Sequence, residues 1–219
     1  MKRSDRKKRF FKQGAGIAVI GEGPTEQYYL LSIQGLLPAN VYPKVAKDGM
    51  DYLIARVEQC IADGYDKIYC LIDMDNKSGQ KEKTAYANFL RQYSGRQFKN
   101  RQTGGHTEVI VIENHPCLEI WFYYYFRLTT GLYSSYENVN PLKQELKKFL
   151  PEYEKRIEFF KKCGGLHQYL TSKGGSIETA VHNSKLSMAH HVDNPDGAFS
   201  EMCRMFEESS VDKTLYERL

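Results

Sequence analysis

The chain has 219 residues, of which 41% are hydrophobic and 13% aromatic, a composition that supports a globular core and excludes an intrinsically disordered chain. The longest apolar run, residues 118–126, is interrupted by an acid and falls far short of the about 20 residues that span a bilayer, so we expect no membrane partner. The net charge of +4 arises in the first dozen residues, which carry seven basic residues and one acid, whereas the remainder has 24 basic and 26 acidic residues.

The basic N-terminal arm, residues 1–13, is expected to be flexible. Lys7, Lys8 and Arg9 lie within it, and basic side chains of this kind bind nucleic acid through its phosphates. A solvated tail without a partner is an equally good interpretation. The arm lacks the apolar centre of a signal peptide, and the five cysteines include no Cys-x-x-Cys pair, so we expect reduced thiols and a cytoplasmic protein.

Between residues 16 and 112, short apolar runs alternate with segments of helical periodicity. We predict strands at 16–21, 41–45, 67–72 and 107–112, and helices at 25–37, 50–62 and 81–93. Pro43 favours an edge position for the second strand. The alternation of strands and helices predicts right-handed crossovers, and hence an α/β fold with a mostly parallel four-stranded sheet flanked by helices.

After residue 115 the pattern contains helices only. We predict them at 116–128, 141–149, 151–163, 176–190 and 198–208. Trp121 and the aromatic residues that follow it are expected in the core. Because no long linker separates the two halves, we divide the chain into the arm 1–13, an α/β core 14–115 and an all-helical C-terminal extension 116–219 packed on that core.

Three carboxylates follow two of the predicted strands. Glu22 comes after the first strand, and Asp73 and Asp75 come after the strand at 67–72. If these strands are neighbours in one parallel sheet, their carboxyl ends meet at one edge, and Asp73 and Asp75 share a face if the strand continues through both. Oxygen ligands suit a hard divalent cation such as Mg²⁺, with Mn²⁺ as an alternative ion. The other interpretation is a turn, since Asp and Asn are common where strands end.

Two glutamates surround the predicted start of the first helix. Gly21 and Gly23 flank Glu22 and would let the backbone approach a ligand closely, although Glu22 could also be an exposed acid in an ordinary strand-to-helix turn. Glu26 lies in the first helical turn, where the helix dipole alone favours a negative side chain. A functional role and a structural role for Glu26 both remain open.

The same residues carry a family resemblance. The segment 19–26, followed some fifty residues later by Ile72-Asp73-Met74-Asp75, resembles the toprim pattern of topoisomerases, bacterial primases and overcoming-lysogenization-defect type nucleases. The segment 113–121 is similar to the Asn-Pro-Cys-Phe-Glu-x-Trp signature of RloB-like proteins, a toprim-related family associated with bacterial restriction and abortive infection. The later Tyr153-Glu154-Lys155 resembles a Tyr-x-Lys element of that family, so the likeness extends over most of the chain from Gly16 onward.

The resemblance implies a toprim-like fold and a role for each matching acid. It implies that Glu22 is a general acid or base or a metal ligand, that Asp73 and Asp75 hold magnesium, and that Glu26 is the second glutamate of the first block. Glu119 would face the same site, although it could instead be satisfied by free amide groups in the first turn of its helix. His115 and Asn76 depart from the usual pattern, which leaves the number of metal ions open.

The favoured function is a magnesium-dependent nuclease or phosphodiester hydrolase in bacterial phage defence. Lys77, the lysine nearest the aspartates in the sequence, could stabilise negative charge or bind nucleic acid. The alternatives are a toprim-like module that binds nucleic acid or a protein partner from a defence locus without catalysis, and a phosphatase with Asp73 as nucleophile, which would leave Glu22 unexplained. The substrate, whether DNA, RNA or a nucleotide, and the oligomeric state and trigger stay open.

Overall fold

The computed structural model describes residues 16–37, 41–45, 50–77, 79–99, 104–135 and 141–206, with the backbone alone for residues 41–45 and 76. The basic arm, with Lys7, Lys8 and Arg9, lies outside the described residues, so its predicted role is not addressed by the structure.

The core of the first half is a parallel sheet in which the order of strands is β2-β1-β3-β5. Its strands are β1 (Ile17–Gly21), β2 (Val41–Val45), β3 (Lys67–Asp73) and β5 (His106–His115). The prediction of an α/β fold with a mostly parallel sheet is therefore confirmed. The condition set for the candidate metal site, that the strands before Glu22 and before Asp73 are neighbours, is met, because β1 pairs directly with β3.

Two short antiparallel strands extend this sheet and correct two predictions. The strands β4 (Gln97–Lys99) and β6 (Phe199–Ser200) both pair with β5. The prediction of four strands was therefore too low, and the C-terminal half is not all-helical. The predicted helix at 198–208 is wrong, because the backbone of Phe199 and Ser200 pairs with β5 and a short 3-10 helix, η2 (Met202–Phe206), follows.

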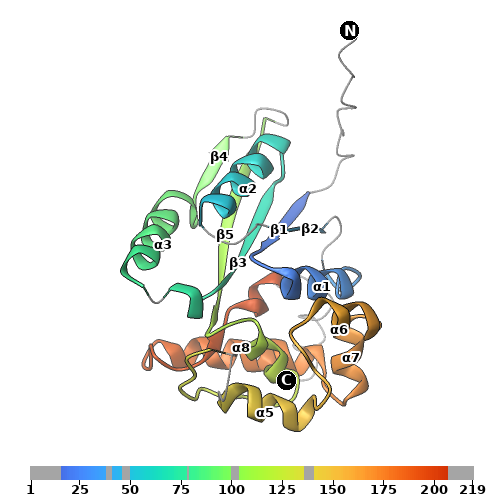
Figure 1. Ribbon diagram of the computed structural model, residues 1–219. Helices are drawn as coiled ribbons and strands as arrows, with labels where there is room; N and C mark the ends of the chain where they lie inside the picture. The colour runs from blue at the N-terminus through green and yellow to red at the C-terminus, as the bar shows by residue number, and fades with distance from the viewer. Residues whose placement is uncertain are drawn as a thin grey trace.

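The two faces of the sheet have different cover. Ala18 and Ile20 point into a cluster with α2 (Met50–Asp63) and α3 (Gln80–Tyr93), which cover one face (Figure 1). Ile17 and Val19 alternate with them and pack on the opposite face against α1 (Pro24–Ser32) and the C-terminal helices. This alternation follows from the two-residue period of a strand.

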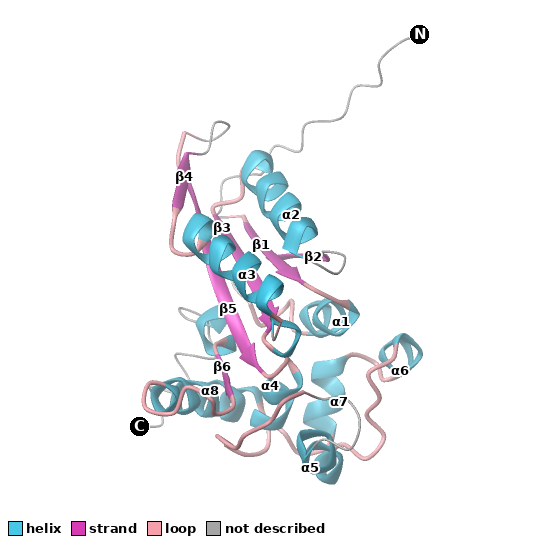
Figure 2. Ribbon diagram, turned by 60° about the vertical axis from the view of Figure 1, so that its left-hand side comes forward, coloured by secondary structure: helices cyan, strands magenta, loops and turns pink. Residues whose placement is uncertain are grey.

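The C-terminal helices pack at the carboxyl end of β5, as Figure 2 shows. The helix predicted at 116–128 spans only Glu119–Tyr124, and the helix predicted at 151–163 spans only Ile157–Lys162. Trp121 is fully buried and belongs to the same hydrophobic cluster as Ile17 and Val19, which confirms its expected place in the core. The helices are α4 (Glu119–Tyr124), α5 (Pro141–Phe149), α6 (Ile157–Lys162), α7 (Leu166–Ser172) and α8 (Ile177–His191).

Among the described residues, none of the helices combines the length and the apolar character needed to cross a bilayer. The boundaries proposed for the arm, the α/β core and the helical extension stay predictions.

Candidate functional site at the carboxyl edge of the sheet

The predicted acids lie at the carboxyl ends of two neighbouring strands. Glu22 directly follows β1, and Asp73 is the last residue of β3. Because β1 and β3 are parallel and paired, these positions share one edge of the sheet. Asp75 does not continue the strand but begins a short 3-10 turn, η1 (Asp75–Lys77), so the condition for Asp73 and Asp75 to share a strand face is not met.

Glu22 is bound by a lysine from η1. The Nζ atom of Lys77 donates to Oε1 of Glu22 at 2.9 Å and to Oε2 at 3.2 Å. Both side chains are largely buried, with 8% of Lys77 and 13% of Glu22 exposed. Lys77, which was expected to contact nucleic acid, is thus engaged with both oxygens of the candidate catalytic glutamate.

Glu26 is buried beside the end of β1. Gly21 makes this position possible, because a Cβ atom at residue 21 would overlap Cβ and Cγ of Glu26. Only 4% of Glu26 is exposed. Burial raises the pKa of Glu26 to about 7, and the charges of Glu119 and Glu22 add to the rise against the opposing effect of Lys155. A carboxyl group with this pKa can exchange a proton near neutral pH.

Asp73 is the most enclosed of the predicted metal ligands. It is 6% exposed, and its Oδ1 accepts a hydrogen bond from the backbone N–H of Leu118 at 2.9 Å. Burial raises the pKa of Asp73 well above its usual range, and the negative charges of Glu26, Glu119 and Asp75 raise it further.

Glu119 lies in the first turn of its helix, and its side chain faces the other acids and binds side chains from the C-terminal half. It is the first residue of α4, and it also faces the other acids closely enough to raise the pKa values of Asp73 and Glu26. It is completely buried. The hydroxyl of Tyr153 donates to Oε1 of Glu119 at 3.0 Å, and Nζ of Lys155 donates to Oε2 at 3.2 Å.

Tyr153 and Lys155 are site residues to which the sequence analysis assigned no role. Their only signal was the Tyr-x-Lys resemblance, and the structure shows that both side chains of that element bind one carboxylate. Burial lowers the pKa of Lys155, but Glu119 and Asp73 outweigh that effect and the net shift is upward. Cys117 lies beside the same acids, and burial together with the charges of Glu119 and Asp73 raises the pKa of its thiol well above its usual value.

Asn114 connects the end of the sheet to the C-terminal half. It lies within β5, and its Oδ1 accepts a hydrogen bond from Oγ of Ser200 at 2.7 Å. The helix α4 starts after Leu118 without a side-chain cap. The Asn114 side chain therefore joins β5 to the C-terminal segment.

The site carries an excess of acid. Five carboxylates and two lysines would have a net charge of 2 − 5 = −3 if all were ionised, which is unfavourable for largely buried groups without protons or a cation. Carboxylate oxygens are the ligands that Mg²⁺ and Mn²⁺ prefer, so the donor set fits such an ion. As the side chains stand, no three His, Cys, Asp or Glu side chains in the described part of the chain are arranged around one metal position. The group consists of Glu22, Glu26, Asp73, Asp75, Glu119, Lys77 and Lys155.

Comparison with curated proteins and with solved structures returned no match. Residues 17–208, which include both strand ends, the 113–121 segment and the Tyr153–Lys155 pair, match the family model described as "RloB-like protein". This match covers most of the chain and every residue of the candidate site, so the chain belongs to the RloB-like protein family.

Proposed function

We propose that this RloB-like protein is a toprim-type, magnesium-dependent phosphodiester hydrolase that cleaves nucleic acid. The observation that carries the proposal is the position of Asp73, which is buried at the carboxyl edge of a parallel sheet among three further carboxylates. Such a group is costly unless protons or a cation compensate its charge. Mg²⁺ has the charge and the ligand preference to do so.

The side chains suggest a division of roles. Glu22, Asp73 and Asp75 would hold the cation, which when bound polarises a phosphate oxygen and activates water. Glu26, with its pKa of about 7, is suited to accept or donate a proton during hydrolysis. Glu119 would hold Lys155 beside the acids, where an ammonium group can stabilise negative charge on a phosphate. The basic arm with Lys7, Lys8 and Arg9 would add affinity for nucleic acid.

The cellular setting of this activity is also a proposal. The resemblance to restriction and abortive-infection proteins supports a role in bacterial phage defence with a partner from the same locus. A cytoplasmic location is supported by the state of the five cysteines, none of which forms a disulfide.

The test is a cleavage assay with single- and double-stranded DNA and RNA. We expect cleavage with Mg²⁺ or Mn²⁺ and none with EDTA. Asp73→Asn and Glu26→Gln, which keep the size of each side chain, should each lower the rate at least about a hundredfold. Asp63→Asn, which changes an acid at the end of α2, is the matched control. Cleavage that survives EDTA and both site substitutions would refute the proposal.

A second candidate is a binding module without catalysis. The observation that favours it is that Lys77 and Lys155 already bind Glu22 and Glu119, because an ion pair can stabilise a carboxylate without a metal. In that case nucleic acid should bind equally well with EDTA and with Mg²⁺, and should be recovered intact. Removal of residues 1–12 should then abolish binding.

A further inference from the structure

The ion pair between Lys77 and Glu22 lies within the candidate cation site. The ammonium group of Lys77 contacts both oxygens of Glu22, and both side chains are largely buried in the structure. The other lysine differs, since 37% of the Lys155 side chain is exposed and Tyr153 takes the second oxygen of Glu119. Lys77 alone satisfies both oxygens of its acid among the described contacts.

The position of Lys77 is fixed by its short turn. The backbone N–H of Lys77 donates to the carbonyl of Met74 at 3.1 Å, and that of Asp75 donates to the carbonyl of Pro116 at 2.8 Å. Lys77 therefore lies two residues after Asp75 in the same turn. Its ammonium group contacts Glu22, which follows the neighbouring strand β1. A divalent cation that binds Glu22 needs the oxygens that Lys77 contacts.

An ammonium group and a divalent cation compete for one pair of oxygens. Removing one partner of a buried ion pair leaves an uncompensated charge, which is costly. A cation that binds Glu22 supplies that compensation and frees the lysine. Cation binding and the Lys77–Glu22 ion pair are thus linked, and each must oppose the other.

We propose that Lys77 is an internal competitor of the divalent cation at Glu22, and that cation binding releases its ammonium group for contact with a substrate phosphate. This inference rests on the cation site of the proposed function and adds a coupling: the lysine becomes available to an anion only when the cation is bound. The site would then bind cation weakly on its own and more tightly together with a phosphate ligand.

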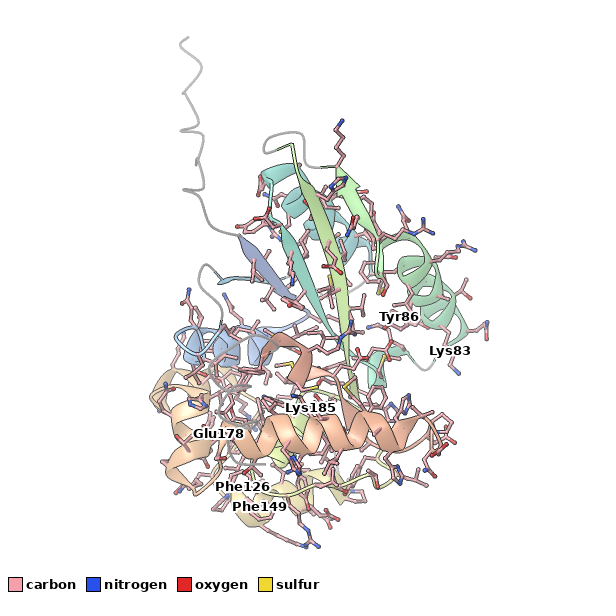
Figure 3. The ribbon with its side chains drawn as sticks, turned by 180° about the vertical axis from the view of Figure 1, so that it is seen from behind. Lys83, Tyr86, Phe126, Phe149, Glu178 and Lys185 are labelled. Carbon is pink, nitrogen blue, oxygen red and sulfur yellow. The ribbon has the colours of Figure 1, made fainter. Side chains whose placement is uncertain are left out.

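The first test measures Mn²⁺ affinity by electron paramagnetic resonance of the free ion, for the full chain and its variants. Lys77→Met keeps an unbranched side chain of similar length without the charge, and should bind Mn²⁺ at least about tenfold more tightly than the unmodified protein. Lys83→Met is the matched control, because Lys83 is exposed on the outer side of α3 (Figure 3) and should leave the affinity unchanged. Equal or weaker binding by Lys77→Met would overturn the inference.

The second test needs no variant, and so holds even if Lys77→Met fails to fold. Labelling of lysines with an amine-reactive ester, read by mass spectrometry, should leave Lys77 protected in EDTA and make it reactive with saturating Mn²⁺. Lys83 should react equally in both conditions. Mn²⁺ binding without increased labelling of Lys77 would overturn the inference while leaving the cation site intact, whereas no Mn²⁺ binding by any variant would refute the cation site itself.

Discussion

Gly21 determines where the Glu26 side chain can lie. A methyl group at residue 21 would occupy the space of Cβ and Cγ of Glu26, and one at residue 23 would come within 3.2 Å of its Oε2. The glycines on either side of Glu22 therefore serve the next glutamate along the chain at least as much as Glu22 itself. The sequence indicated a close approach at these glycines but could not identify the group that approaches.

We expect Gly21→Ala to destabilise the protein by about 1 to 3 kcal/mol and to reduce cleavage, because Glu26 has to move within a packed site. Urea unfolding and the cleavage assay measure the two effects. Gly35→Ala is the control, since a Cβ atom there meets no heavy atom within 4 Å, and its effect should stay within about 0.5 kcal/mol. Equal effects of the two substitutions would contradict the steric explanation.

The raised pKa of Glu26 predicts how stability depends on pH without metal. The usual pKa is 4.5 and the folded value is about 7, so between these pH values the unfolded chain loses its proton while the folded chain keeps it. The contribution of Glu26 to the free energy of unfolding should therefore be largest below about pH 4.5. This contribution should be about 3 kcal/mol smaller once the pH has passed 7. Urea unfolding in EDTA at several pH values measures this.

Glu26→Gln should remove that part of the decline, because glutamine cannot ionise. Glu154→Gln changes an exposed acid and should leave the pH profile as it is in the unmodified protein. If the profiles of Glu26→Gln and the unmodified protein run parallel from pH 4 to pH 8, Glu26 does not titrate as described.

The site residues differ in how far the sequence could identify them. Glu22 and Asp73 were predictable because each follows a short apolar strand, and the ends of neighbouring parallel strands must meet. The contacts of Glu119 with Tyr153 and Lys155 join residues more than thirty positions apart, across a loop and α5, and no local pattern encodes such a contact. For Lys155 the family resemblance was the one available signal.

At the scale of elements, the strand β6 connects the C-terminal end of the described chain to β5, next to the candidate site. Ser200 is fully buried, and its Oγ donates to Oδ1 of Asn114 at 2.7 Å and accepts from the backbone N–H of Met202 at 3.2 Å. The segment Asn114 to His115 thus pairs with β6 immediately before α4 and the buried Glu119.

We expect Ser200→Ala to cost about 1 to 3 kcal/mol of the free energy of unfolding, because it leaves buried polar groups of Asn114 and Met202 without this partner. Chemical denaturation measures the loss. Ser172→Ala is the control, since Ser172 is exposed at the end of α7 and should cost less than about 0.5 kcal/mol. If both substitutions lower the free energy of unfolding equally, the hydrogen bonds of Ser200 do not have the stabilising role described here.

The elements that the sequence missed are the short ones. The four parallel strands were predicted to within about three residues of their observed ends, since β1, β3 and β5 each contain a continuous apolar run. In contrast, β4 has three residues and β6 has two, too few for any periodicity to appear. The apolar residues of 199–206 are buried as expected, but their spacing resembles one face of a helix, which produced the wrong helix at 198–208.

At the scale of the molecule, one hydrophobic cluster joins the sheet to the C-terminal helices. Ile17, Val19 and Leu71 from the sheet belong to the same cluster as Trp121 and Phe206 from the C-terminal half. On the outer side of that half, Phe126 and Phe149 stack with their ring centres 4.8 Å apart (Figure 3). The α1 face of the sheet therefore depends on the helices for its cover.

A chain that ends at residue 115 should not fold cooperatively, because it would expose the apolar face that the helices cover. We expect strong binding of the dye ANS and a broad thermal transition, whereas the full chain should bind little dye and unfold in one sharp transition. A sharp transition in the shortened chain would show that residues 14–115 are an independent domain.

The strand β5 runs through the junction of the two halves. It pairs with β3 as far as Asn114, and with β6 at Asn114 and His115, so one continuous ladder of hydrogen bonds crosses the boundary. A hinge between the halves would have to break that ladder, unlike the loop hinges on which domains usually close around ligands. If the proposed function is right, nucleic acid must therefore reach the buried acids through a local rearrangement, such as a shift of the η1 turn, and not through opening of the two halves.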